Sequence, residues 1–243
     1  MYYNDDRNYG SRTYEEEFAT VRGMNAFISK VYGWMFLGLL LTAVVSYYVA
    51  TSERILFAIF TNPLIFYGIL IGQVILVIAL SARITRMSFG GALSMFLIYA
   101  ALNGVTFSAV LLAFAGETIT SAFAITAVTF GVMSIYGYVA RTDLTQFRSI
   151  LFMGLIGILI LSLVNIFLRS SNVEWLISIV SLFVFLGLTA YDMQKLKGYY
   201  FGTYGNVALR NNLGIIGALS LYLDFVNLFL TILRLFGRSR RRA

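Results

Sequence analysis

Long, unbroken runs of apolar residues dominate the chain, and short polar connections separate them. A helix needs about 20 apolar residues to cross a hydrocarbon core of about 30 Å. The runs do not alternate between apolar and polar positions, as the strands of a membrane barrel do. The pattern therefore predicts seven membrane-spanning helices, over residues 31–50, 64–82, 90–115, 119–140, 150–168, 176–191 and 213–236.

Polar segments flank this apolar region at both ends. Residues 1–30 are predicted to be a polar N-terminal tail that leads into an interfacial segment, and residues 237–243 a basic C-terminal tail. The polar lead and the first run are too long for a cleavable signal peptide, so the first run is expected to be a retained anchor. The predicted fold is all-α, with a polytopic, seven-helix membrane domain over residues 31–236.

The composition agrees with a membrane protein and narrows the chemistry. Hydrophobic residues make up 59% and charged residues 12% of the 243 residues, against about 45–50% and about 25% in a soluble domain. The chain has no cysteine and no histidine. Disulfides, thiolate or imidazole metal sites and histidine-based nucleophile systems are therefore excluded, and no cofactor is indicated. Proton chemistry is left to carboxylates, Lys, Tyr and hydroxyl groups.

The net charge of +7 comes from short basic segments between and beyond the apolar runs. This distribution is typical of orientation signals in a membrane protein and disfavours nucleic acid as a partner. With the N-terminus inside, the inner segments hold 11 Lys and Arg residues and the outer connections hold 2, which predicts a cytoplasmic N-terminus. Seven full spans place the basic tail outside, whereas a re-entrant last segment would keep it inside. We favour seven spans, because the last run is long enough to cross.

Two acidic residues lie within the apolar runs, where an ionisable group costs several kcal/mol and is a functional candidate by default. Asp192 lies at the end of the sixth run, and Asp224 lies in the middle of the seventh. Asp192 could instead be a charged helix end at the membrane surface, with Lys195 and Lys197 as inner anchors. For the two aspartates to meet, the sixth helix must continue past Asp192 or the seventh must start late.

Asp224 belongs to a polar stripe along the last run. The stripe has steps of four, three and four residues, and it consists of Ser220, Asp224, Asn227 and Thr231. These steps place all four side chains on one helical face, which must avoid lipid and lie against other helices or along a hydrated path. The alternative is a set of interhelical hydrogen bonds that only holds the bundle together. The central carboxylate favours a functional role, whereas Asn103 in the third run is a weaker candidate.

Two carboxylates in a poorly solvated site cannot both ionise freely, and they titrate as a unit. A proton-sensitive latch could be built in this way without histidine. A nearby arginine would give the ionised form a partner, and Arg83 and Arg86 follow the second run on the same, inner side. The alternative for both arginines is ordinary positive-inside anchoring.

Two segments carry a resemblance to a known family. The last run reads GALSLYLDFVNLFL over residues 217–230, and the segment at residues 191–194 reads YDMQ. They resemble the C-terminal signature and the sixth-helix motif of the Bax-inhibitor family, also called the transmembrane BAX-inhibitor-motif family. The polar tail, the seven runs and the short loops are similar to bacterial members along essentially the whole chain. The resemblance implies a seven-helix bundle in a bacterial plasma membrane, with the last helix near its centre.

The resemblance also implies a function, that of a pH-sensitive, calcium-permeable leak channel. In such proteins two aspartates on the last two helices, joined by an arginine from the end of the second, form a proton-controlled latch. The matching positions are Asp192, Asp224 and one of Arg83 or Arg86. The chain has no EF-hand-like acidic spacing, so calcium contact at the two aspartates would be weak. The implied partners are calcium ions, protons and the lipid bilayer.

Two other classes of function stay open. One is a non-transporting regulator that binds other membrane proteins, as a cell-death suppressor or a modulator of a membrane protease. The remote one is an intramembrane aspartyl protease, which also carries Tyr-Asp on its sixth helix and an aspartate on its seventh. The Gly-x-Gly motif of those enzymes is missing, because residues 221–223 before Asp224 read LYL. Their Pro-Ala-Leu motif is also missing, because the single proline, Pro63, is followed by Leu64. We therefore expect no enzymatic activity.

Overall fold

The computed structural model describes residues 6–203 and 205–237, with side chains from residue 20 onward. The start of the predicted N-terminal tail, at residues 1–5, and most of the basic C-terminal tail, at residues 238–243, lie outside the described residues. The described chain is built from α-helices and two 3₁₀ turns: α1 Asp6–Thr51, α2 Glu53–Phe60, α3 Pro63–Arg83, η1 Ile84–Arg86, α4 Phe89–Ala113, α5 Gly116–Val139, η2 Leu144–Phe147, α6 Arg148–Leu168, α7 Ser171–Gly202 and α8 Val207–Phe236.

Seven of these helices are long and apolar enough to cross a membrane, which confirms the predicted all-α polytopic fold. Their burial differs sharply. In the apolar stretch of α8, 72% of the residues are buried, against 39% in α7 and 6% in α3. The outer helices expose large apolar side chains, as expected of helices that face lipid, among them Leu64 on α3 and Phe167 on α6.

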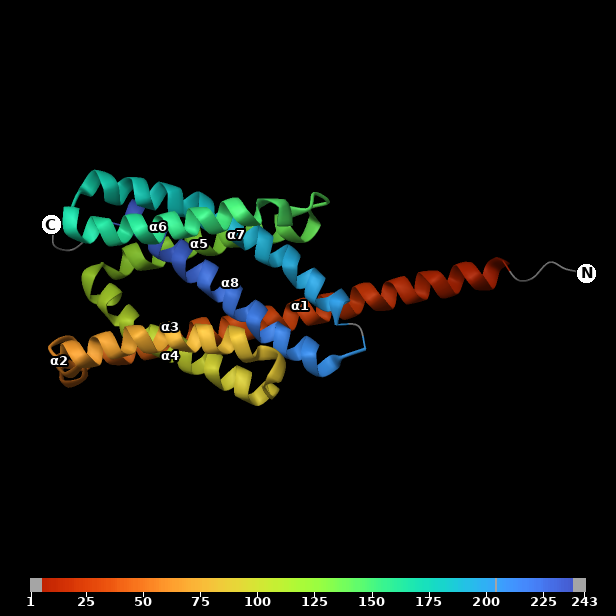
Figure 1. The fold of residues 1–243 in the computed structure, drawn as a ribbon, viewed down its shortest axis with the longest axis horizontal. Helices are drawn as coiled ribbons and strands as arrows, with labels where there is room; N and C mark the ends of the chain where they lie inside the picture. The colour runs from red at the N-terminus through yellow and green to blue at the C-terminus, as the bar shows by residue number, and fades with distance from the viewer. Residues whose placement is uncertain (1–5, 204, 238–243) are drawn as a thin grey trace, which may run out of the picture.

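The last helix lies near the centre of the bundle, as predicted. Figure 1 shows α8 crossing obliquely between α1, α3 and α4 on one side and α5, α6 and α7 on the other. α8 contacts α1, α4, α5 and α7, whereas α3 and α6 reach the bundle mainly through α4 and α7. The two helices with the highest mean hydropathy, α3 and α6, thus lie between the bundle and the lipid, and α8 is enclosed.

Several helices extend beyond the apolar runs that predict them. α7 continues to Gly202 and α8 begins at Val207, so most of the polar segment between the last two runs is helical. The turn between them uses Gly205, whose φ of 82° favours glycine, and Asn206, whose side chain accepts a hydrogen bond from the Leu209 N–H at 2.9 Å. Hydropathy shows where lipid touches a helix, whereas these capping groups determine where the helix ends.

Two features of the N-terminal half were not foreseen from the apolar runs. α1 begins at Asp6, and Figure 1 shows its first part extending well past the rest of the bundle. The contact of this part with the membrane surface stays a prediction. The short helix α2 follows the first span and has no buried residue. Its position between two spanning helices and its apolar side chains are typical of a segment that lies on the membrane surface.

Hydrogen bonds attach α8 to its neighbours at two levels. The Tyr222 hydroxyl lies 2.7 Å from the Thr42 hydroxyl, which also donates to the Ala100 carbonyl at 2.9 Å, so α1, α4 and α8 are joined in the core. Near the start of α8, the Asn212 amide donates to the carbonyls of Ile84 at 3.0 Å and Met87 at 2.7 Å. These bonds satisfy polar groups that lipid could not, and they fix the end of α3 against α8.

A close backbone approach joins α5 to α7. A Cβ atom added to Gly137 would lie 2.8 Å from the Cα of Ala190, and closer still to the Ala190 carbonyl oxygen. Membrane helices gain no hydrophobic free energy by associating with each other, so small residues that allow such approaches contribute much of the attraction. Gly137 therefore positions the part of α7 that carries Asp192.

We expect Gly137→Ala to destabilise the purified protein by about 1–3 kcal/mol, the usual cost of overpacking. The reason is that the new methyl group must push the α5 and α7 backbones apart. Gly131→Ala on the same helix is the matched control, because its Cβ meets open space. That control should gain up to about 1 kcal/mol from helix propensity. Thermal unfolding in detergent measures both, and equal shifts would contradict the close contact.

The orientation can be tested with single cysteines, since the chain has none. Two exposed positions are suitable, Asn172 before the apolar part of α7 and Ala208 at the start of α8. In intact cells an impermeant maleimide should label Asn172→Cys and should label Ala208→Cys only after permeabilisation. The reverse pattern would invert the topology.

Candidate functional site

Asp224 lies in the middle of α8, the most enclosed helix of the bundle. The residue is only 4% exposed, and its Oδ2 has no hydrogen-bond partner in the described part of the chain. A buried carboxylate oxygen without a donor is costly when ionised, because neither water nor a protein group compensates for its lost solvation. The free energy of the surrounding structure therefore depends on whether this carboxylate is protonated.

Asp192 lies on α7, which packs directly against α8. Because α7 continues about three turns beyond it to Gly202, Asp192 is inside a helix, which is the condition for the two aspartates to meet. The two carboxylates interact electrostatically, and the Ser220 side chain of α8 interacts with Asp192. The structure thus brings together three of the predicted site residues, Asp192, Asp224 and Ser220.

Lys195 is the cation at this site. Its Nζ lies 3.6 Å from Oδ1 of Asp192, and its charge also acts on Asp224. The Lys195 amine lies 5.9 Å from the ring centre of Tyr191 and 5.5 Å from that of Tyr199. The aromatic faces favour a cation in this position. From the sequence, Lys195 was predicted only as a membrane anchor. The signal for its role is the spacing of three residues from Asp192, which places both side chains on one helical face.

Arg83 and Arg86 do not take part in this cluster. Both side chains are exposed at the end of α3 and in η1, and neither forms an ion pair with an aspartate in the residues that the structure describes. Asn212 holds η1 against the start of α8, which is about 18 Å along the helix from Asp224. An arginine partner for the aspartates stays a prediction, and in this structure Lys195 occupies that role.

The predicted polar stripe of α8 is divided between two environments. Asp224 and Thr231 are buried, and Thr231 Oγ1 also lacks a partner among the described residues. Ser220 and Asn227 are partly exposed, and the Asn227 amide donates to the carbonyl of Leu223 on its own helix at 2.8 Å. Only Ser220 is therefore placed to act with the two carboxylates.

Asn103 belongs to a different cluster. It is buried on α4, where its side chain interacts with Tyr99 and Tyr222. Tyr222 in turn bonds Thr42 of α1. This cluster joins three helices, and it explains Asn103 as a packing residue better than as part of an ion path.

Residues that follow Asp192 fix its position on the bundle. The Tyr32 hydroxyl donates to the Met193 sulfur at 3.5 Å. The Gln194 amide donates to the Thr142 carbonyl at 2.9 Å and accepts from the Leu144 N–H at 2.7 Å. The segment at residues 191–194 therefore attaches α7 both to α1 and to the connection between α5 and α6, which holds the Asp192 carboxylate in place.

The site is too sparse to hold a metal ion firmly. In the described ranges no group of three or more His, Cys, Asp or Glu side chains could bind one. Two carboxylates and one hydroxyl supply few of the six to eight oxygen ligands that calcium takes. A cation at this pair would keep most of its water.

Comparisons with known proteins agree with this architecture. Residues 24–241 match the model of a family described as inhibitor of apoptosis-promoting Bax1. The chain is 46% identical over 220 residues to the inner membrane protein YbhL of Escherichia coli K12, covering 90% of this chain and 94% of that protein. It is 43% identical over 216 residues to an uncharacterized protein of Borreliella burgdorferi, covering 89% and 93%. It is 40% identical over 219 residues to an uncharacterized membrane protein of Streptococcus pyogenes serotype M3, covering 89% and 94%.

Lys195→Met should change how the aspartate pair titrates, because it removes the cation beside Asp192 while keeping a side chain of similar length. Without that countercharge, a larger fraction of the pair should stay protonated at a given pH. The infrared absorption of the protonated carboxyl group, followed as the pH is raised, measures this fraction. Arg83→Met and Arg86→Met are the controls and should leave the titration unchanged. A change in either control, with none in Lys195→Met, would assign the countercharge to an arginine instead.

Proposed function

This chain belongs to the Bax inhibitor family, and we propose that it is a pH-sensitive, calcium-permeable leak channel gated by the Asp192–Asp224 pair. The observation that carries the proposal is the Asp224 carboxylate, which is 4% exposed in the central helix and has an oxygen without a partner in the described residues. Most buried polar atoms in proteins have a hydrogen-bond partner, so this unpartnered carboxylate oxygen supports a functional role. Ionisable groups inside a membrane are typical of functional sites, among them ion and proton paths.

Protonation would act on the contact between α7 and α8. Asp192, Asp224 and Lys195 together carry no net charge when one proton is bound to the pair, and one negative charge when none is bound. In a poorly solvated interface, a change of one charge alters both the association of the two helices and the attraction for a passing cation. The pair thus couples the proton concentration to helix packing.

Opening requires movement, because Asp224 is enclosed in this conformation. Asp192 is 14% and Lys195 35% exposed, so the cluster is more accessible at the α7 side than at the centre of α8. Separation of α8 from α7 would admit water to Asp224 along the partly exposed Ser220. Carboxylates and hydroxyls are ligands suited to hard cations, which supports calcium as the ion; the family resemblance supports it further.

The proposed location is a bacterial plasma membrane. The seven spans make the chain an integral, multi-pass membrane protein, and the relative in Escherichia coli carries the name inner membrane protein. The Lys and Arg distribution supports a cytoplasmic N-terminus. The accessible side of the aspartate cluster then faces the cytoplasm, since α7 ends and α8 begins there.

Calcium flux into liposomes that contain only the purified protein tests the proposal directly. The wild type should show a flux that depends on pH. Asp224→Asn removes the charge but keeps the shape, so it should flatten the pH dependence, and Asp192→Asn should do the same. Because the pair titrates as a unit, the double variant should resemble either single variant rather than their sum.

Asp143→Asn is the matched control for these variants. Asp143 lies outside the spanning segments, in the connection between α5 and α6, and its carboxylate accepts a hydrogen bond from the Thr145 N–H at 2.9 Å, which lowers its pKa. Asparagine keeps that acceptor, so the pH profile of the calcium flux should not change.

Additive effects at Asp192 and Asp224, or an unchanged pH profile in Asp224→Asn, would exclude the latch. No flux from the wild type would favour a non-transporting regulator that binds other membrane proteins.

A further inference from the structure

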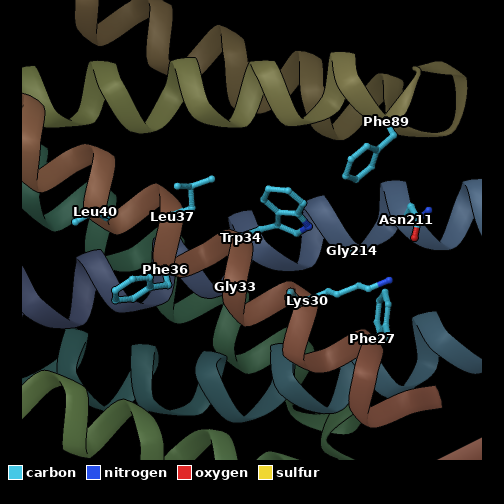
Figure 2. A pocket seen from close by; sticks show the side chains of 11 residues that line it. Phe27, Lys30, Gly33, Trp34, Phe36, Leu37, Leu40, Phe89, Asn211 and Gly214 are labelled. Atoms are coloured by element: carbon cyan, nitrogen blue, oxygen red, sulfur yellow. The ribbon is translucent and has the colours of Figure 1, made fainter. Parts of the chain in front are cut away.

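A groove of about 660 Å³ lies between α1, the start of α4 and the start of α8. Figure 2 shows its floor and walls, with Trp34 of α1 beside Phe89 of α4 and with Lys30 extended toward the end where Asn211 lies. The Trp34 and Phe89 ring centres are 5.9 Å apart. The lining is apolar and aromatic except at the end that holds Lys30 and Asn211.

The groove opens toward lipid. Phe36 and Leu40 of α1 line it, and both are largely exposed on a membrane-spanning helix. Within a bilayer an apolar recess of this kind is filled by whatever hydrocarbon lies next to it. Its volume is within the range of about 300–1,000 Å³ that ligand sites in proteins have. An acyl chain therefore matches the long, apolar part of the groove.

The polar end lies at the membrane surface. Phe89 is the first residue of α4, and Asn211 is in the first turns of α8, so both helices begin at this end of the groove. Trp34 is also there, and tryptophan is enriched at the level of lipid headgroups. A lipid whose chain occupies the apolar part would therefore have its headgroup beside Lys30 and Asn211.

Lys30 determines which headgroup fits. It is the one charged residue of the lining, and it forms no ion pair or hydrogen bond with the residues that the structure describes. No acidic side chain lines the groove. An exposed ammonium group beside a lipid slot attracts a phosphate that carries net negative charge.

We propose that this groove binds an anionic phospholipid, with one acyl chain along α1 and the headgroup at Lys30 and Asn211. The site is separate from the aspartate pair, and it does not depend on the proposed leak activity. It implies that the surface of the bundle discriminates between lipids according to headgroup charge.

Native mass spectrometry of the full chain, titrated with phosphatidylglycerol or with phosphatidylcholine, tests the proposal. The wild type should retain phosphatidylglycerol more strongly. Lys30→Gln should reduce that preference about fivefold, the effect of one lysine near an anionic membrane surface. Arg22→Gln is the matched control, because Arg22 is also exposed on α1 but does not line the groove. It should keep the preference of the wild type.

Gly33→Leu tests the apolar part without disturbing the fold. Gly33 lines the groove, and a Cβ atom there meets nothing within 4 Å, so a leucine can enter the empty space. It should reduce retention of both lipids, whereas Gly68→Leu, an equally open position on α3, should not. Equal retention of the two lipids by the wild type, or an unchanged Gly33→Leu, would overturn the proposal. A dimer that Gly33→Leu dissociates would also overturn it, because it would assign the groove to a second copy of the chain.

Discussion

A carboxylate in the middle of a membrane-spanning helix cannot face hydrocarbon, and the arrangement of this bundle follows from that constraint. Asp224 is flanked on α8 by bulky apolar residues, yet the helix as a whole is the most buried of the bundle. An ordinary amphipathic helix would turn its polar side toward water. Here no water-facing side exists, so other helices must surround α8, and α3 and α6 provide the lipid-facing cover.

Enclosing a helix within a membrane requires attraction that the hydrophobic effect does not supply. The bundle uses short backbone contacts and hydrogen bonds instead. Gly137 lets α5 approach Ala190 of α7, and Gly104 lets α4 approach the backbone of Thr42 on α1. The Thr42–Tyr222 bond then joins α1 to α8. The same contacts that make the enclosure possible also fix Asp192 and Asp224 on neighbouring helices, so stability and the candidate site share one set of interactions.

A hydropathy pattern records which parts of the chain face lipid. The features that follow from lipid contact could therefore be predicted from the sequence. The seven spans, the central last helix and the two intramembrane aspartates were all predicted from apolar runs and motifs. The extension of α7 to Gly202 was not predicted, because its polar residues alternate with buried ones such as Leu196 and Tyr200. The helix ends only where Gly205 and Asn206 form the turn.

Lys195 was predicted as an anchor, since a sequence shows a lysine near a membrane surface but not the carboxylate that its amine contacts. Arg83 and Arg86 lie at the end of a span, where the sequence placed them, and their side chains are exposed. An arginine partner for the aspartates stays a prediction.

Access to the aspartate pair is asymmetric, which affects how a gate built on it would work. Asp224 is buried, whereas the side chains of Asp192 and Lys195 are 14% and 35% exposed, toward the end of the bundle where α7 ends and α8 begins. In the proposed gate, protons from that side would meet Asp192 before Asp224. The first turns of α8 at the same end also carry Asn211 and Gly214, which line the groove beside Lys30. A lipid in that groove would touch the segment of α8 that leads to Asp224, so both the proton concentration and the lipid composition of one leaflet would act on the same helix.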